Sequence, residues 1–286
     1  MNFREIISLV IPSSKFWKGF SVDSLGARYG EWAIVTGASS GIGAEFANRL
    51  AGEGMNLVLV ARCEEKLGRL KTVLSDQYGV NVVCLQIDLS QDECLKPLVE
   101  ACRNLEIGLV VNNAGTGTQG VLSSGDIQAE KDVVRLNCTT SLDVTHHFLP
   151  GMLSRGRGGI VLVSSLMGFQ GVPYIANYSA TKGYLLNLGE ALHHECKASG
   201  VDVLVLAPGA TEAPGKYLHE VDYSKLLILW MSAEKVVDVA LKKMGKKAFV
   251  IPGIRNHIMA CLSGGLWSRG WVQGVMLKLA KLMLPA

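Results

Sequence analysis

The chain has 286 residues, of which 49% are hydrophobic and 19% are charged. This length fits one large domain, and the apolar content excludes an intrinsically disordered chain. Lys and Arg number 28 against 25 Asp and Glu, and the resulting charge of +3 is too small to make nucleic acid the expected partner. The seven cysteines are scattered without a C-x-x-C pair, so we expect reduced thiols in a cytoplasmic protein.

Seven short apolar runs rich in β-branched residues predict buried strands. They alternate with amphipathic segments, of which 41–53 and 64–78 are followed by Gly54 and Gly79, residues typical of a helix C-terminus. Strands without polar alternation are expected where helices cover both faces of a parallel sheet. The pattern therefore predicts an α/β fold, a single-domain doubly wound (Rossmann-type) sheet. The predicted strands are 32–36, 56–61, 81–87, 108–112, 159–164, 201–206 and 247–251.

The first predicted strand runs into a glycine-rich turn, T-G-A-S-S-G-I-G, which a predicted helix follows. Glycine permits a tight turn and a close approach of the backbone to a pyrophosphate, and the helix N-terminus offers unpaired N–H groups to that anion. A glycine turn without a ligand is the alternative, which the preceding strand and the following helix disfavour. The candidate cofactor-binding residues are Gly37, Ser39, Ser40, Gly41, Ile42 and Gly43.

The end of the second predicted strand indicates which dinucleotide binds. A free ribose 2′-hydroxyl is usually met there by Asp or Glu, but Ala61 and Arg62 occupy the position. A guanidinium can bind a 2′-phosphate through two hydrogen bonds, so we predict that the cofactor is NADP(H). The alternative is that Arg62 is a solvated loop residue that does not contact the cofactor. Asp88 and Leu89 follow the third strand, where Asp88 is placed either to accept from the adenine amino group or to cap the next helix.

Three polar motifs follow predicted strands or open a predicted helix. N-N-A-G (112–115) follows the fourth strand, Ser165 follows the fifth, and Tyr178 and Lys182 lie four residues apart on one helix face. The carboxyl ends of parallel strands share one edge, where open sheets bind ligands, so these motifs converge on one crevice. The cofactor candidates among them are Asn113, Ala114, Gly115, Tyr178 and Lys182.

In combination, these motifs resemble the short-chain dehydrogenase/reductase family over about residues 30–252. The motifs are T-G-x-x-x-G-x-G, N-N-A-G, a Ser thirteen residues before a Tyr, and Y-x-x-x-K. R-Y-G-E-W (28–32), M-N-L-V-L (55–59) and E-E-K-L (64–67) are similar to the branch of hydroxysteroid dehydrogenases and long-chain 3-oxoacyl-CoA reductases.

The resemblance implies further site residues. Asn137 matches a fourth catalytic residue, which anchors a water-mediated proton path to the lysine. Pro208 and Gly209 match a loop that covers the nicotinamide, but Ala213 stands where the family usually has Thr, so Thr211 is the candidate to replace it.

The chemistry of the side chains assigns roles to these residues. A free Tyr has a pKa of about 10, and the nearby Lys182 ammonium stabilises its anion, so Tyr178 becomes a general acid/base. Ser165 holds the substrate oxygen as charge develops on it, and the cofactor carries the hydride. Each residue singly has a structural explanation, but together they indicate a catalytic site.

We therefore predict an NADP(H)-dependent oxidoreductase that interconverts a ketone and a secondary alcohol on an apolar substrate, steroid-like or fatty-acyl. A catalytically silent NADP-binding regulator or scaffold is the alternative. The adjacent pairs 146–147 and 193–194 are histidines, but neighbours on a helix point about 100° apart, so no metal is expected. Both pairs lie on helices that form the dimer contact in the resembled family, which implies a homodimer or homotetramer.

The motifs also divide the chain into segments. Residues 30–252 form the dinucleotide-binding catalytic domain, preceded by an N-terminal extension at 1–29. The apolar segment 211–232, with Tyr217, Leu226 and Trp230, predicts a substrate lid or part of the core. The amphipathic tail at 253–286 has an apolar stripe from Trp271 that fits a lid, an oligomer contact or a peripheral membrane contact. We favour packing within the protein, since buried stripes are commoner.

Overall fold

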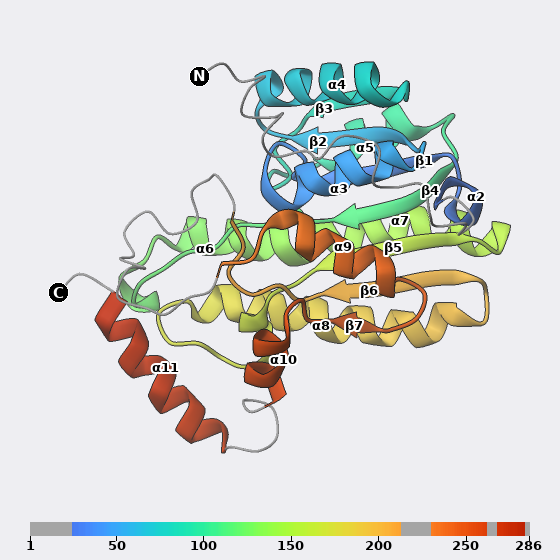
Figure 1. Cartoon of the computed structure of the whole chain (residues 1–286). Helices are drawn as coiled ribbons and strands as arrows, with labels where there is room; N and C mark the ends of the chain where they lie inside the picture. The colour runs from blue at the N-terminus through green and yellow to red at the C-terminus, as the bar shows by residue number, and fades with distance from the viewer. Residues whose placement is uncertain (1–24, 213–229, 262–267, 284–286) are drawn as a thin grey trace.

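The structure is a computed structural model that describes residues 25–212, 230–261 and 268–283. Its centre is a seven-stranded parallel sheet in the order β3-β2-β1-β4-β5-β6-β7, with helices packed on both faces (Figure 1). This confirms the doubly wound fold predicted from the sequence. The strands are β1 (Trp32–Thr36), β2 (Asn56–Ala61), β3 (Val82–Gln86), β4 (Ile107–Asn112), β5 (Gly158–Val163), β6 (Val201–Leu206) and β7 (Phe249–Val250).

Helices connect the strands and extend beyond β7. Gly79 follows the second long helix at φ +70°, the left-handed conformation that glycine adopts at a helix end. In the described part of the chain the helices are α2 (Leu25–Tyr29), α3 (Gly41–Gly52), α4 (Glu64–Tyr78), α5 (Leu95–Cys102), α6 (Ile127–Val134), α7 (Thr140–Arg155), α8 (Ala176–Lys197), α9 (Ala233–Lys243), α10 (Ile254–Cys261) and α11 (Arg269–Met283). Three shorter turns are η2 (Leu122–Ser124), the π-helical η3 (Arg135–Thr139) and η4 (Leu166–Phe169).

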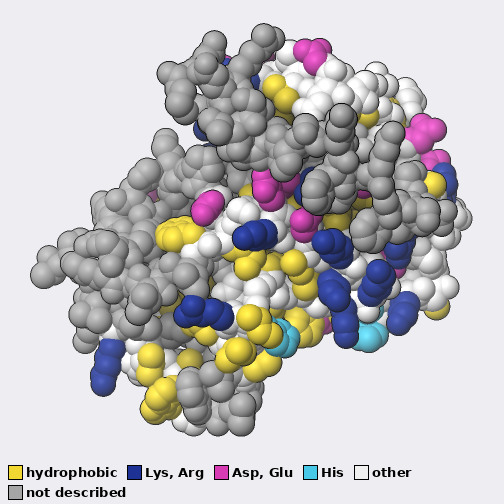
Figure 2. Space-filling model, viewed as in Figure 1, with side chains coloured by type: hydrophobic (Ala, Val, Ile, Leu, Met, Phe, Trp, Pro, Cys, Tyr) yellow, Lys and Arg dark blue, Asp and Glu magenta, His cyan; other side chains and the backbone are white. Residues whose placement is uncertain are grey.

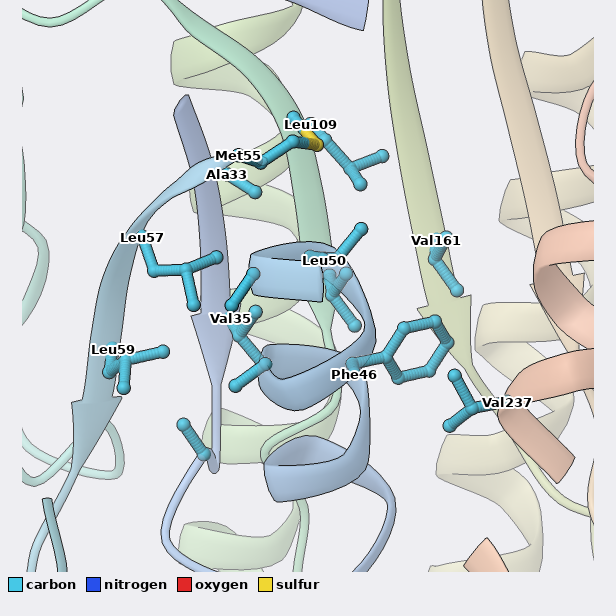
Figure 3. Packing of buried hydrophobic residues seen from close by; sticks show 14 of the residues in the cluster. Ala33, Val35, Phe46, Leu50, Met55, Leu57, Leu59, Leu109, Val161 and Val237 are labelled. Carbon is cyan, nitrogen blue, oxygen red and sulfur yellow. The ribbon is translucent and has the colours of Figure 1, made fainter. Parts of the chain in front are cut away.

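Two apolar clusters hold the helices against the sheet. Successive side chains of a strand point to opposite faces, so in β1 Val35 joins one cluster and Ile34 the other. The first cluster packs α3, α4 and α9 on one face, and the second packs α5, α7 and α8 on the other. Figure 3 shows Phe46 and Leu50 of α3 against the strands, with Val237 of α9 beside Phe46. Because both faces are covered, most residues of the strands are apolar.

The C-terminal edge of the sheet differs from the sequence prediction. The β7 ladder covers Phe249–Val250 rather than 247–251, because this edge strand pairs with β6 alone. The chain then forms α10, a helix that the sequence pattern did not predict. The following α11 contains the apolar stripe that begins at Trp271.

Several segments named from the sequence lie wholly or partly outside the described residues. These are 1–24 of the extension, 213–229 of the expected lid, with Tyr217, Leu226 and Ala213, and 262–267 and 284–286 of the tail. The described ends of the lid segment meet, because Thr211 forms a β-bridge with Met231. The C-terminal part of the extension packs on the domain, where the Tyr29 side chain is buried. No helix among the described residues is long and apolar enough to cross a membrane.

Candidate active site

The sheet order places one crevice at the carboxyl ends of β1 and β4. From β1 the chain proceeds to β2 and β3 on one side, and it then returns to β4 and proceeds to β7 on the other side. The order of the strands therefore reverses between β1 and β4. Open parallel sheets bind ligands at such a switch point. The glycine turn follows β1, N-N-A-G follows β4, and Ser165 follows β5, so the fold brings these three motifs to the same edge.

The turn after β1 has the geometry of a phosphate cradle. Gly37 and Gly41 have φ angles of +65° and +55°, which side chains rarely adopt. A Cβ on Gly43 would lie 2.3 Å from the Gly37 carbonyl oxygen, so only glycine fits there. Ser40 precedes α3 in an extended conformation, and its hydroxyl does not cap the helix. The N-terminal amides of α3 therefore remain available to an anion, which fits a dinucleotide pyrophosphate.

Ser39 and Ile42 complete this turn and are both half-buried. Asn113 ties the turn to the N-N-A-G motif, because its Nδ2 donates to the carbonyl oxygen of Thr36 at 2.9 Å and to that of Gly37 at 3.3 Å. The Thr36 hydroxyl in turn accepts from the backbone amides of Asn113 and Ala114, at 2.9 and 3.0 Å. The side chain of Asn113 thus supports the cradle from behind.

The end of β2 lies beside the glycine turn, because the Ala38 amide donates to the Val60 carbonyl at 3.2 Å. Arg62 follows β2 with an exposed side chain. Its guanidinium lies near Asp88, where partial burial acts to raise the pKa of the carboxyl, but hydrogen bonds from Ser90 and the charge of Arg62 lower it. A cation, and no carboxylate, thus follows β2, where dinucleotide-binding folds usually carry the acidic residue for the ribose.

Asp88 and Leu89 follow β3 in a short turn. The Asp88 Oδ1 accepts from the Ser90 amide at 3.0 Å and the Ser90 hydroxyl at 2.7 Å. Helix α5 begins only at Leu95, so Asp88 stabilises this turn rather than a helix start. The Leu89 side chain is buried, and its carbonyl accepts from the Thr140 hydroxyl at 2.7 Å.

Tyr178, Lys182 and Gly115 converge at the opening of α8. The Lys182 side chain is only 4% exposed, and its Nζ donates to the Val163 carbonyl at 2.9 Å and lies 5.8 Å from the centroid of the Tyr178 ring. A Cβ on Gly115 would lie 3.1 Å from Lys182 Nζ, and one on Gly117 would lie 2.8 Å from the Tyr178 ring. The glycines leave room for these two side chains to meet at the crevice.

Asn137 is fully buried and joins the loop after β4 to α8. Its Oδ1 accepts from the Thr116 amide, and its Nδ2 donates to the Thr116 carbonyl and the Thr181 hydroxyl, all at 2.9 Å. It lies in the π-helical segment η3, between α6 and α7. A π-helical turn inside a helix is often found at functional sites.

Ser165 lies two residues after β5 and is also buried. Its hydroxyl accepts from the Met167 amide at 3.2 Å as the cap of η4. The Leu166 amide donates to the Pro208 carbonyl at 2.9 Å, which brings the loop after β6 beside Ser165. Thr211 donates its hydroxyl to the Gly209 carbonyl at 3.1 Å, so in this structure it stabilises the loop itself.

Two of the described histidines, His147 and His193, pack within the fold. The His193 ring is buried, and its Nδ1 lies 2.8 Å from the Val203 carbonyl oxygen. His147 packs edge-on against Phe148. These contacts assign the two rings to packing between α8 and β6 and along α7.

The sequence interpretation missed Thr36, Thr116 and Thr181, which hold the candidate residues in place. Thr181 receives the hydrogen bond from Asn137 and donates its own hydroxyl to the Tyr178 carbonyl at 2.8 Å. The bond to the Tyr178 carbonyl could have been predicted from the sequence, because a threonine hydroxyl in a helix often donates to the carbonyl three or four residues earlier. The contact to Asn137 spans 44 positions and had no local signal.

Together, the sheet, the anion cradle and the buried ammonium beside a tyrosine define a nucleotide-binding oxidoreductase. The chain matches the family model for short chain dehydrogenases over residues 31–219. It therefore belongs to the short-chain dehydrogenase family and catalyses oxidoreduction between ketones and alcohols.

The relatives place the chain within this family. It is 31% identical over 236 residues to the 7beta-hydroxysteroid dehydrogenase of Collinsella aerofaciens, with 82% of this chain and 90% of the relative covered. It is 32% identical over 243 residues to the very-long-chain 3-oxoacyl-CoA reductase of Mus musculus, with 84% and 76% covered. These relatives confirm the resemblance to the hydroxysteroid dehydrogenase and oxoacyl-CoA reductase branch.

Solved structures agree with the fold. A structure from a study of 7beta-hydroxysteroid dehydrogenase stereoselectivity superposes with a TM-score of 0.82 at 29% identity, covering 88% of this chain and 99% of that one. A short-chain dehydrogenase from Sphingobium yanoikuyae, solved in complex with NADPH, gives a TM-score of 0.73 at 32% identity, with 86% and 94% covered.

Proposed function

We propose that the protein is an NADP(H)-dependent oxidoreductase that interconverts a ketone and a secondary alcohol on an apolar, steroid-like or fatty-acyl substrate. The observation that carries this proposal is the buried Lys182 ammonium beside the Tyr178 ring, with Asn137 and Gly115 converging on it. When bound, NADP(H) supplies the hydride. A silent NADP-binding regulator would have no use for a buried cation at this point, because burying it costs stability.

We propose a catalytic role for each of these side chains. In reduction, the Tyr178 hydroxyl donates a proton to the carbonyl oxygen, and the Lys182 ammonium stabilises the phenolate that remains. The Ser165 hydroxyl holds the same oxygen as negative charge develops. Asn137 keeps the loop after β4 against α8 and anchors the polar path by which Lys182 exchanges protons.

Lys182 predicts how turnover depends on pH. Burial lowers the pKa of its ammonium to about 8. The charged form that stabilises the Tyr178 phenolate is present below this pH and is lost above it. We expect kcat for ketone reduction to fall as pH rises through about 8, in a pH profile at saturating cofactor and substrate. A kcat that stays constant to about pH 10, near the ordinary lysine pKa, would contradict this assignment.

The preference for NADP(H) rests on Arg62, and the NADPH complex of a related dehydrogenase supports it. We expect Arg62→Ala to raise the KM for NADPH about tenfold or more and the KM for NADH far less, because only NADPH carries the 2′-phosphate. The measurement is initial rates with both cofactors, and Arg69→Ala on α4 is the matched control. Equal weakening toward NADPH and NADH would show that Arg62 does not discriminate.

The substrate class is tested by NADPH oxidation with a panel of ketones. We expect turnover of steroid ketones or 3-oxoacyl thioesters and little turnover of polar sugar ketones. This expectation rests on the similarity to a hydroxysteroid dehydrogenase and to a 3-oxoacyl-CoA reductase. NADPH binding without turnover of any ketone would instead support a regulator. The segment 211–232 is proposed as the lid over this substrate, with its described ends joined at Thr211 and Met231.

We further propose a homodimer or homotetramer that contacts through α7 and α8. Leu142 and Tyr184 are exposed large side chains on these helices. Sedimentation of the purified protein gives the assembly mass, and a monomer would refute the proposal. All seven cysteines are free thiols, which supports a cytoplasmic location.

A further inference from the structure

Charge is distributed unevenly along this chain. The last 48 residues, 239–286, contain no Asp or Glu, whereas the preceding 238 residues carry five more acidic than basic residues. Residues 239–286 therefore carry a net charge of +8, although the net charge of the whole chain is only +3. Such a local excess of positive charge indicates attraction to an anionic partner. The eight basic residues are Lys242, Lys243, Lys246, Lys247, Arg255, Arg269, Lys278 and Lys281.

Helix α10 presents large apolar side chains to solvent within this basic region. Ile254, Ile258 and Met259 are 74%, 49% and 54% exposed. Ile254 and Ile258 are four residues apart and lie on the same side of the helix, and Met259 extends the exposed apolar surface beside Ile258. The opposite side of α10 faces the protein, where Ala260 packs with Leu166 and the cluster at the end of β6. We call the outward side the α10 face.

A basic groove adjoins the α10 face. It has a volume of about 660 Å³, with Ala248 to Ile251 as its apolar floor. Lys243, Lys247, His194 and His257 line it, with Glu190 as its only acidic lining residue among the described part of the chain. Figure 2 shows Lys and Arg side chains gathered over α9 and the approach to β7, with apolar side chains next to them over α10.

Helix α10 lies at the same edge of the sheet as the candidate active site. A Cβ on Gly209 would lie 2.7 Å from the Asn256 side chain, so α10 abuts the loop after β6. Ala260 of α10 packs with Leu166 and Phe169, which follow Ser165 in the chain. A partner of the α10 face would therefore lie close to the opening of the substrate crevice.

We infer that the α10 face and the basic groove dock the protein on a bilayer that contains anionic phospholipid. Exposed Ile and Met side chains enter the head-group region, while Lys243 and Lys247 bind the phosphate and carboxylate groups of the lipids. Nucleic acid also attracts lysines, but it gives no reason for an exposed aliphatic helix face. The docking also delivers an apolar substrate from the lipid side, and this last step alone rests on the proposed function.

The test is co-sedimentation of the full chain with vesicles of phosphatidylcholine alone or mixed with phosphatidylglycerol. We expect binding only to the mixed vesicles, weakened at high ionic strength. Lys243→Gln/Lys247→Gln should lose at least tenfold in affinity, since a lysine near such a surface contributes about fivefold. Free inorganic phosphate, added as a competitor, should not release the protein.

A second variant tests the apolar contribution. Ile254→Ser/Ile258→Ser should also lose about tenfold, because it removes the side chains that enter the bilayer. The matched controls, Lys66→Gln/Lys71→Gln on α4 and Leu153→Ser on α7, change exposed residues away from the groove and should bind as wild type. Turnover of a water-soluble ketone in lipid-free buffer should be unchanged in every variant.

Three results would overturn the inference. The first is that the protein binds phosphatidylcholine vesicles as well as the mixed vesicles, or that its binding does not depend on salt. The second is that the double lysine variant and the double isoleucine variant both bind the mixed vesicles as wild type does. The third is a lower sedimentation mass of Ile254→Ser/Ile258→Ser without lipid, which would make the α10 face an interface between copies of this chain. A protein that binds vesicles as described but reduces no ketone would refute the proposed function and leave this inference standing.

Discussion

Replacing Tyr178 by Phe is expected to lower kcat by about 10²–10⁴-fold, the usual contribution of a general acid/base, while the Kd for NADPH changes little. Phe keeps the ring that packs against Gly117 and lies 5.8 Å from Lys182 Nζ, but it has no proton to transfer. Steady-state rates give kcat, and quenching of tryptophan fluorescence gives the Kd.

Tyr184→Phe is the matched control for this result. Tyr184 lies on the same helix, α8, six residues further on, and its side chain is exposed. The control should keep wild-type turnover. If Tyr178→Phe retained more than about a hundredth of wild-type activity, Tyr178 would not be the general acid/base.

The second large effect is expected at Asn137. Asn137→Leu removes three hydrogen bonds and leaves the amide and the carbonyl of Thr116 without these partners, while the Thr181 hydroxyl keeps only its bond to the Tyr178 carbonyl. Each buried unpaired group costs about 1–3 kcal/mol, so we expect about 3 kcal/mol or more of lost stability. For a domain of this size the Tm should fall by about 10 °C. Turnover should also fall at least tenfold at temperatures where the variant is folded, because the loop that carries Gly115 loses its anchor beside Lys182.

Asn112→Leu separates these two effects. Asn112 is also a buried asparagine, and its Nδ2 donates to the Thr145 hydroxyl at 3.0 Å and the Ser141 carbonyl at 3.4 Å, between β4 and α7. It should lower the Tm comparably while the folded protein keeps its turnover. Thermal melts followed by circular dichroism, with rates measured well below each Tm, give both quantities. Parallel losses of turnover in the two variants would assign Asn137 a purely structural role.

The core strands were predictable because their apolar runs are local. The bounds of β1, β2 and β6 match the predicted segments, those of β4 differ by one residue at its start, and those of β3 and β5 differ by one residue at each end. Such strands are buried on both faces, so their composition alone marks them. Strand β7 and helix α10 were harder to predict. At the sheet edge, pairing with a single neighbour and contact with β6 and η4 decide where each element begins and ends.

The sequence by itself determined the doubly wound fold, the glycine cradle and the residue types of the candidate site, because glycine turns, strand ends and the four-residue spacing of Tyr178 and Lys182 are local features. Only the tertiary structure decided how these residues act on one another. Burial that lowers the pKa of Lys182 to about 8 depends on β5 and on the loop after β4, which are distant in sequence. The hydrogen bonds of Asn137 likewise join three segments, and no local pattern encodes which groups desolvate or pair when those segments meet.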